Sequence, residues 1–245
     1  MPYHPAQGAR RGAFARCFAA ALLLTLAAAA WAVYLNAVSR PLFEKALLET
    51  VDAAALGTNE DALRGFAEDT LLFLTGSTQA WEPDLTVGGV PASRFISQAF
   101  RDHMGTVRGW VTAAPWVLGG AAAVAAGLLG WALAGAGRRG GFSMQGYYAG
   151  VAVPLALLAG VGVWAVLDFA SLWKILHLTL IPDGIFPAGD PVMQLFPEAL
   201  FSAYLTPVCR TLAIMLAALL VLPLILRPVS LRIAGARARL GGTKR

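Results

Sequence analysis

The chain has 245 residues, of which 58% are hydrophobic and only 13% carry charge, with a formal net charge of +5. A water-soluble domain of this size averages about 25% charged residues, so the composition excludes a soluble globular protein and indicates a membrane protein. The two cysteines, Cys17 and Cys209, fit no metal-binding spacing, and we expect no disulfide between them.

Four apolar runs are each long enough to cross about 30 Å of hydrocarbon as a helix. The fourth run contains Arg210, close enough to one end for its side chain to reach the interface. The resulting division is a tail at 1–16, spans at 17–39, 109–137, 146–167 and 207–226, connections at 40–108 and 168–206, a hairpin at 138–145 and a basic tail at 227–245.

The basic residues predict the orientation of these spans. Arg10, Arg11 and Arg16 precede the first span, Arg138 and Arg139 lie in the hairpin, and the C-terminal tail is basic, whereas all 14 acidic residues lie in the two long connections. Basic segments stay on the cytoplasmic side, so we expect both termini inside and both long connections outside the membrane. A cleaved signal peptide is the alternative for the first run, but no cleavage site stands out.

The first long connection has the pattern of three helices and a ribbon. Helical stripes follow one another along it: Leu42, Ala46, Leu47 and Val51, and then Leu63, Phe66, Ala67, Thr70, Leu71 and Leu74 after a capping pattern near Asn59. Gly76 is placed to end the second helix, and Gly88–Gly89 predict the turn of a short ribbon. Ser93 predicts the start of a third helix, with Ile96, Phe100 and His103 on its apolar face.

The second long connection begins with a short helix. Phe169, Trp173 and His177 share one helical face, Asp168 is a candidate N-cap, and Pro182 must end the helix. One further helical turn is expected after Pro191, and Trp173 and Phe186 are suited to anchor at the membrane interface. The predicted fold class is therefore an all-α polytopic membrane protein with four transmembrane helices and a mostly helical outer cap that includes a short β-ribbon.

The two connections contain one histidine each, His103 and His177, and both lie on apolar stripes. Burying an imidazole costs free energy unless it is bonded, and an apolar stripe needs no polar residue. The conservative interpretation is a partly buried histidine bonded to a backbone carbonyl. The alternative is a two-histidine site, in which a base and a donor transfer protons near neutral pH.

Other chemistries have less support in the sequence. Zinc held by His103 and His177 with Asp183 or Asp190 is a competing interpretation, although no His-x-x-x-His or cysteine pair supports it. His4 lies in the predicted cytoplasmic tail. A transporter needs ionisable residues within its spans, and only Arg210, at one end, is present. We expect no cofactor, no metal and no nucleic-acid partner.

Two segments resemble a known family. The segment Phe95 to Val107, with His103, and the segment Phe169 to Phe201, with His177, Asp190 and Leu-Phe-Pro197, are similar to the two histidine segments of the bacterial lipoprotein intramolecular transacylases. The family also has four spans, a long first and a shorter second outer loop. It usually has an Asp three residues after the first histidine, where this chain has Thr106.

The resemblance implies an acyltransferase whose substrates are diacylglyceryl-modified lipoproteins and whose surroundings are membrane lipids. Such enzymes move the sn-2 acyl chain to the amine of the lipoprotein's N-terminal cysteine, which gives the lyso form. His103 and His177 would carry the proton transfers, and Asp190 would orient His177. A non-enzymatic membrane accessory protein of the same fold is the alternative, and the oligomeric state is not predicted.

Overall fold

The computed structural model describes residues 5–135, 141–181, 184–187 and 189–242. The hairpin arginines Arg138 and Arg139, as well as His4 and Asp183, lie outside these residues. Contacts divide the chain into two compact units: unit 1 is Met1–Trp31, Trp116–Val161 and Thr211–Arg245, and unit 2 is Ala32–Pro115 and Gly162–Arg210. None of the 14 acidic residues belongs to unit 1.

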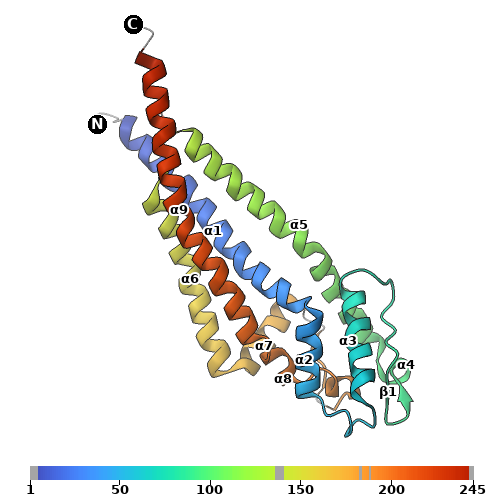
Figure 1. Ribbon diagram of the computed structural model, residues 1–245. Coiled ribbons are helices and arrows are strands. Elements are labelled where there is room, and N and C mark those ends of the chain that lie inside the picture. Colours follow the sequence, from blue (N-terminus) through green and yellow to red (C-terminus); the bar gives the residue numbers. More distant parts are fainter. Residues whose placement is uncertain (1–4, 136–140, 182–183, 188, 243–245) are drawn as a thin grey trace. The chain divides into compact units, whose positions relative to one another are not determined.

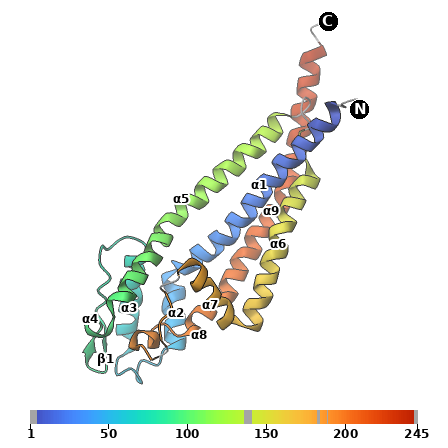
Figure 2. The same cartoon turned by 180° about the vertical axis from the view of Figure 1, so that it is seen from behind.

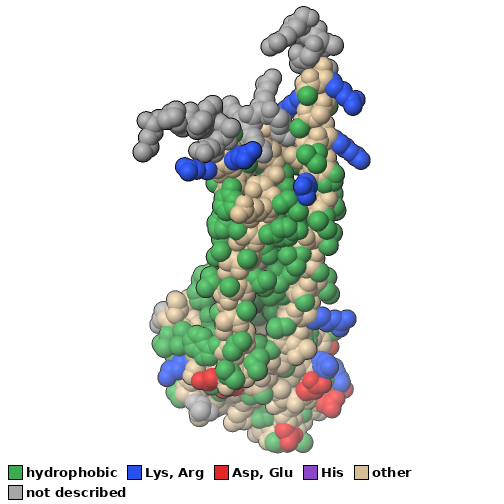
Figure 3. All heavy atoms as spheres, turned by 90° about the vertical axis from the view of Figure 1, so that its left-hand side faces the viewer, with side chains coloured by type: hydrophobic (Ala, Val, Ile, Leu, Met, Phe, Trp, Pro, Cys, Tyr) green, Lys and Arg blue, Asp and Glu red, His purple; other side chains and the backbone are tan. Residues whose placement is uncertain are grey.

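Four long helices dominate the ribbon: α1 (Pro5–Ala37), α5 (Gln98–Ala134), α6 (Met144–Leu167) and α9 (Leu205–Gly242) (Figure 1). Four described helical stretches are long and apolar enough to cross a membrane, namely Gly8–Ala37, Gln98–Ala134, Met144–Leu167 and Glu198–Arg239. The four-helix membrane architecture predicted from the sequence is therefore confirmed. On the face shown in Figure 3, hydrophobic side chains cover most of these helices, and the acidic side chains visible there belong to unit 2.

Small residues allow close helix packing in unit 1. A Cβ atom added to Gly146 of α6 would lie 2.5 Å from the carbonyl oxygen of Phe14 in α1, and one added to Gly150 would meet the carbonyl oxygen of Phe18 even more closely. The two glycines are four residues apart, so they lie on one face of α6, and their missing side chains let the two backbones touch. Cys17, Ala20 and Ala21 are fully buried beside this crossing.

Proline interrupts the helical hydrogen bonds of α9 and a tyrosine replaces one of them. Pro223 has no N–H, which leaves the carbonyl of Leu219, four residues earlier, without its usual helical donor. The hydroxyl of Tyr147, a side chain that is 0% exposed, donates to this carbonyl at 3.0 Å. A polar group inside a membrane helix bundle is thereby satisfied by a neighbouring helix.

Unit 2 contains the shorter elements. They are α2 (Arg40–Thr50), α3 (Glu60–Leu74), the antiparallel pair β1 (Thr86–Val87) and β2 (Val90–Pro91), α4 (Ala92–Phe95), α7 (Phe169–Leu180), the 3₁₀ turn η1 (Pro191–Gln194) and α8 (Glu198–Ser202). Asn59 caps α3 by accepting from the amide of Ala62, and Gly88 and Gly89 form the ribbon turn with positive φ. The helical cap and its small ribbon are as predicted.

The predicted third helix is two helices in the structure. Ser93 lies inside the short α4, whose N-cap is Pro91, and Ile96 ends α4 in an extended conformation. The side chain of Ser97 then accepts from the amide of Phe100 at 3.2 Å and starts α5. The prediction of Ser93 as the cap was wrong because Ser97 lies where the chain resumes helical geometry.

An aromatic core joins the two long connections inside unit 2. Three aromatic rings surround Phe196 of the second connection. They belong to Trp81, to Phe66 of α3 and to Phe100 of α5, and their centroids lie between 5.5 and 6.3 Å from that of Phe196. Rings at these separations make favourable tilted and edge contacts as well as burying large apolar areas. Helices α7 and α8 lie side by side in the rear view (Figure 2), and Trp173 stacks on Phe201 at 4.3 Å.

Candidate functional site

His103 lies near the start of α5, on the side of that helix that faces the aromatic core. Phe100, one turn earlier, is buried, and its ring lies 5.8 Å from the imidazole. Phe186 of the second connection meets the imidazole edge-on at 5.5 Å. Nδ1 of His103 is buried and has no hydrogen-bond partner among the described residues.

His177 lies on α7, and the start of this helix is fixed by Asp168. The carboxylate of Asp168 accepts from the amide of Ser171 at 3.0 Å, as an N-cap should. The hydrogen bonds from the Ser171 side chain and amide hold the pKa of Asp168 below its ordinary value. Phe169, Trp173 and His177 then form the predicted stripe, with centroid distances of 5.7 and 4.5 Å along it.

One nitrogen of His177 has a defined partner. Nδ1 lies 3.0 Å from the carbonyl oxygen of Trp173, which can only accept a hydrogen bond. Nδ1 therefore carries a proton, and in the neutral ring the lone pair is on Nε2. This is the arrangement of an imidazole that can take a proton from another molecule.

The two imidazoles lie against each other. Their ring centroids are 6.0 Å apart and their planes are inclined by 28°. Burial lowers the pKa of His103, and the neighbouring His177 lowers it further, so the His103 ring favours its neutral form. The sequence predicted that His103 and His177 belong to one site, and the geometry of unit 2 brings their rings into contact.

Gly184 contacts both rings and was not singled out from the sequence. A Cβ added there would be 2.5 Å from Cε1 of His103 and 3.1 Å from Cδ2 of His177. Phe186 was predicted to anchor at the membrane interface, yet its ring packs against Phe100 at 4.8 Å. A proline-rich segment without periodicity gives no sequence signal for either contact.

Two described carboxylates, those of Asp190 and Asp102, accept hydrogen bonds from groups other than the histidines. Asp190 accepts from the amide of Val192 at 3.0 Å and so caps η1, and its orientation of His177 stays a prediction. Asp102 accepts from the side chain of Gln98 at 2.8 Å, and the hydroxyl of Thr106 donates to the Asp102 carbonyl. Over the described ranges, no group of three His, Cys, Asp or Glu residues is placed to hold a metal ion.

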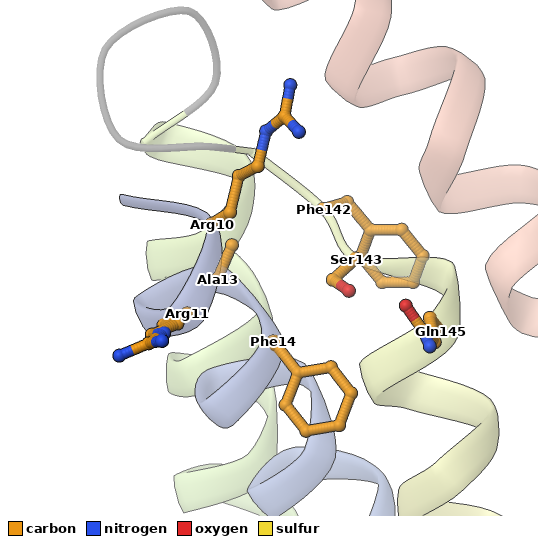
Figure 4. Close-up of a pocket in the computed structure, with 7 residues that line it drawn as sticks. All are labelled: Arg10, Arg11, Ala13, Phe14, Phe142, Ser143 and Gln145. Carbon is orange, nitrogen blue, oxygen red and sulfur yellow. The ribbon is translucent and has the colours of Figure 1, made fainter. Parts of the chain in front are cut away.

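A cavity of about 450 Å³ lies in unit 1. It is lined by Arg10, Arg11, Ala13, Phe14, Phe142, Ser143 and Gln145 (Figure 4). The figure shows both arginine side chains directed away from the hollow between Phe14 and Phe142. Neither histidine of the pair belongs to its lining, so the cavity is not part of the candidate site.

The four long apolar helices and the helical cap define a polytopic integral membrane protein, in which the rings of two histidines of unit 2 lie side by side. A solved structure with this fold is that of the membrane-integral lipoprotein intramolecular transacylase Lit from Bacillus cereus. The match has a TM-score of 0.55 and covers 97% of each chain at 15% sequence identity. No family model matches the sequence, and no curated protein does. At this identity the likeness establishes the fold.

Proposed function

We propose that this protein is a membrane-embedded acyltransferase that moves the sn-2 acyl chain of a diacylglyceryl lipoprotein to the amine of the lipoprotein's N-terminal cysteine. The observation that carries the proposal is the contact between His103 and His177, whose ring centroids are 6.0 Å apart. The fold shared with Lit, a lipoprotein intramolecular transacylase, supports the same substrate class. The charge pattern supports a site on the extracytoplasmic face of the cell membrane, with both termini in the cytoplasm.

This reaction needs little from the enzyme beyond proton transfer and positioning. The nucleophile and the ester belong to one molecule, so the amine nitrogen attacks the ester carbonyl without an acyl-enzyme intermediate. The bond from carbonyl carbon to the glyceryl oxygen then breaks, an amide forms, and the proton lost by nitrogen ends on the glyceryl oxygen. Two neighbouring imidazoles are sufficient for these transfers.

The hydrogen bonds of the two rings suggest different roles. His177 donates through Nδ1 to Trp173, so its Nε2 takes the amine proton and afterwards gives it to the leaving oxygen. Nδ1 of His103 is buried without a partner in the described chain, and an unpartnered buried N–H costs free energy. We therefore assign the proton of neutral His103 to Nε2, from which it donates to the carbonyl oxygen as negative charge develops there.

The outer surface of α7 suits a lipid substrate. Ile175, Leu178 and Leu180 are 47%, 50% and 51% exposed although they lie on the helix that carries His177. Apolar side chains exposed to this degree are stable in contact with acyl chains and unfavourable in water. An acyl chain of the substrate can therefore approach His177 along an apolar surface.

The test is mass spectrometry of a lipoprotein N-terminus after incubation of the purified protein with a diacylglyceryl lipoprotein. We expect His103→Gln and His177→Gln each to lower the transfer rate by about 100- to 10,000-fold. His4→Gln, at the remaining histidine, is the matched control and should leave the rate unchanged. Undiminished transfer in both site variants would remove the proposal, and absence of transfer by the wild-type protein would favour an accessory role.

A further inference from the structure

Gly184 is attached to the end of the helix that carries His177. Ile181 caps α7 by donating its amide to the carbonyl of His177 at 2.8 Å, and the amide of Gly184 donates to the carbonyl of Ile181 at 2.9 Å. Consecutive backbone hydrogen bonds thus connect His177 to Gly184. Movement of this glycine relative to α7 would break at least one of them.

Gly184 also lies against the imidazole of His103. A Cβ added to Gly184 would lie 2.5 Å from Cε1 and 2.7 Å from Nδ1 of His103, and 3.1 Å from Cδ2 of His177. Cβ atoms essentially never approach other atoms to less than 3.0 Å, so no side chain fits here while the rings stay in place. The backbone of Gly184 therefore lies next to the buried Nδ1 of His103.

The need for glycine at this position is steric. Glycines with positive φ in the described chain are Gly57, Gly76, Gly88, Gly89 and Gly141, and Gly184 is not among them. An alanine could therefore adopt the same backbone conformation, and only the contact with the two rings excludes it. Gly189, in the same connection, has nothing within 4 Å of its added Cβ and no positive φ, which makes it a matched control.

We infer that Gly184 is a positioning residue that seats the imidazoles of His103 and His177 against each other for proton transfer. This inference rests on the proposed acyl transfer and names a residue that sets its geometry. Gly184 itself touches the two catalytic side chains and not the reacting atoms. Its missing side chain lets the backbone at this position lie against both rings.

The expected effect of a methyl group follows from the distances. With Gly184→Ala, the His103 ring must move by about 1 Å to reach ordinary contact distance from the new Cβ. A displacement of this size in a reacting arrangement lowers a rate by about 100-fold. We expect kcat to fall by this factor with a much smaller change in KM, because the lipid-contacting surface of α7 is not altered.

The experiment compares the wild-type protein with Gly184→Ala and Gly189→Ala in detergent micelles. One readout is the rate of acyl transfer, and the other is the nuclear magnetic resonance spectrum of protein labelled only at histidine, which has three residues to assign. His103→Gln and His177→Gln identify the two signals of the pair. We expect Gly184→Ala to shift both signals and to lower kcat, and Gly189→Ala to leave both readouts unchanged.

The outcomes separate this inference from the proposed function. If the wild-type protein transfers acyl chains and Gly184→Ala does so at an unchanged rate, the positioning role is overturned and the function stands. If the wild-type protein transfers none, the proposed function falls, and the spectra still decide whether Gly184 seats the rings. Unshifted histidine signals in Gly184→Ala overturn the inference in either case.

Discussion

The hydroxyl of Tyr147 should stabilise unit 1 only because Pro223 leaves a carbonyl without a donor. The hydroxyl donates to Leu219 at 3.0 Å from a fully buried side chain. Tyr147→Phe removes this donor with almost no change in volume. Hydrogen bonds between membrane helices contribute about 0.6–1.7 kcal/mol, so we expect the variant to lower the free energy of unfolding by about 1 kcal/mol.

A double-mutant cycle makes the reasoning specific. Pro223→Ala restores an N–H four residues after Leu219, so this carbonyl gains a helical donor. In that background Tyr147→Phe should have a smaller effect, within about 0.5 kcal/mol of zero. Tyr148→Phe is the matched control, because its hydroxyl is 3.3 Å from the carbonyl of Leu220, for which Leu224 supplies a helical N–H.

The assay is reversible unfolding of the purified protein in mixed micelles with increasing denaturing detergent, followed by circular dichroism. Equal losses for Tyr147→Phe in the wild-type and Pro223→Ala backgrounds would refute the explanation, because the hydroxyl would then act independently of the proline. A loss for Tyr148→Phe as large as that for Tyr147→Phe would refute it as well.

Three further outcomes are expected. Gly150→Ala should destabilise unit 1 by about 1–3 kcal/mol in the same unfolding assay, because the added Cβ meets the α1 backbone. Gly160→Ala, on the same helix but with open space around the added Cβ, should not destabilise it. Equal effects of the two substitutions would contradict the close crossing of α1 and α6. Asp190→Asn keeps an oxygen that accepts from the Val192 amide but removes the negative charge. If Asp190 orients His177, the rate of acyl transfer should fall by about 10-fold while the thermal stability stays unchanged. An unchanged rate would leave Asp190 only its role as the cap of η1. Green fluorescent protein fused to either terminus should fluoresce, because both termini are predicted to be cytoplasmic; a dark fusion at either end would contradict that orientation.

Hydrophobic periodicity was sufficient to predict the buried face of α3 and the aromatic stripe of α7. The stripe from Leu63 to Leu71 is buried in α3 as expected, and Phe169, Trp173 and His177 share one face of α7. Local capping rules also worked at Asn59 and Asp168, whose side chains accept from the first turns of α3 and α7. These features depend on residues close together in the chain, so the sequence alone determines them.

The sequence was insufficient where two signals competed or where the chain is irregular. Ser93 and Ser97 can both cap a helix, and the extended conformation of Ile96 decides between them. Pro223 reveals that a carbonyl lacks a helical donor, but only the packing of α6 shows that Tyr147 supplies one. Gly184 lies in a segment without periodicity, and its contact with the two histidines depends on how the connections fold over each other.

The central claim is that His103 and His177, whose rings are in contact, transfer the protons of an acyl transfer within one lipoprotein molecule. The most direct measurement is mass spectrometry of lipoprotein N-termini from a bacterial host without its own transacylase, expressing the wild-type chain, His103→Gln or His177→Gln at equal membrane levels. We expect N-acylated, lyso-form N-termini with the wild-type chain and only the diacylglyceryl form with either variant. Lyso-form N-termini in equal amounts from all three strains would contradict the account.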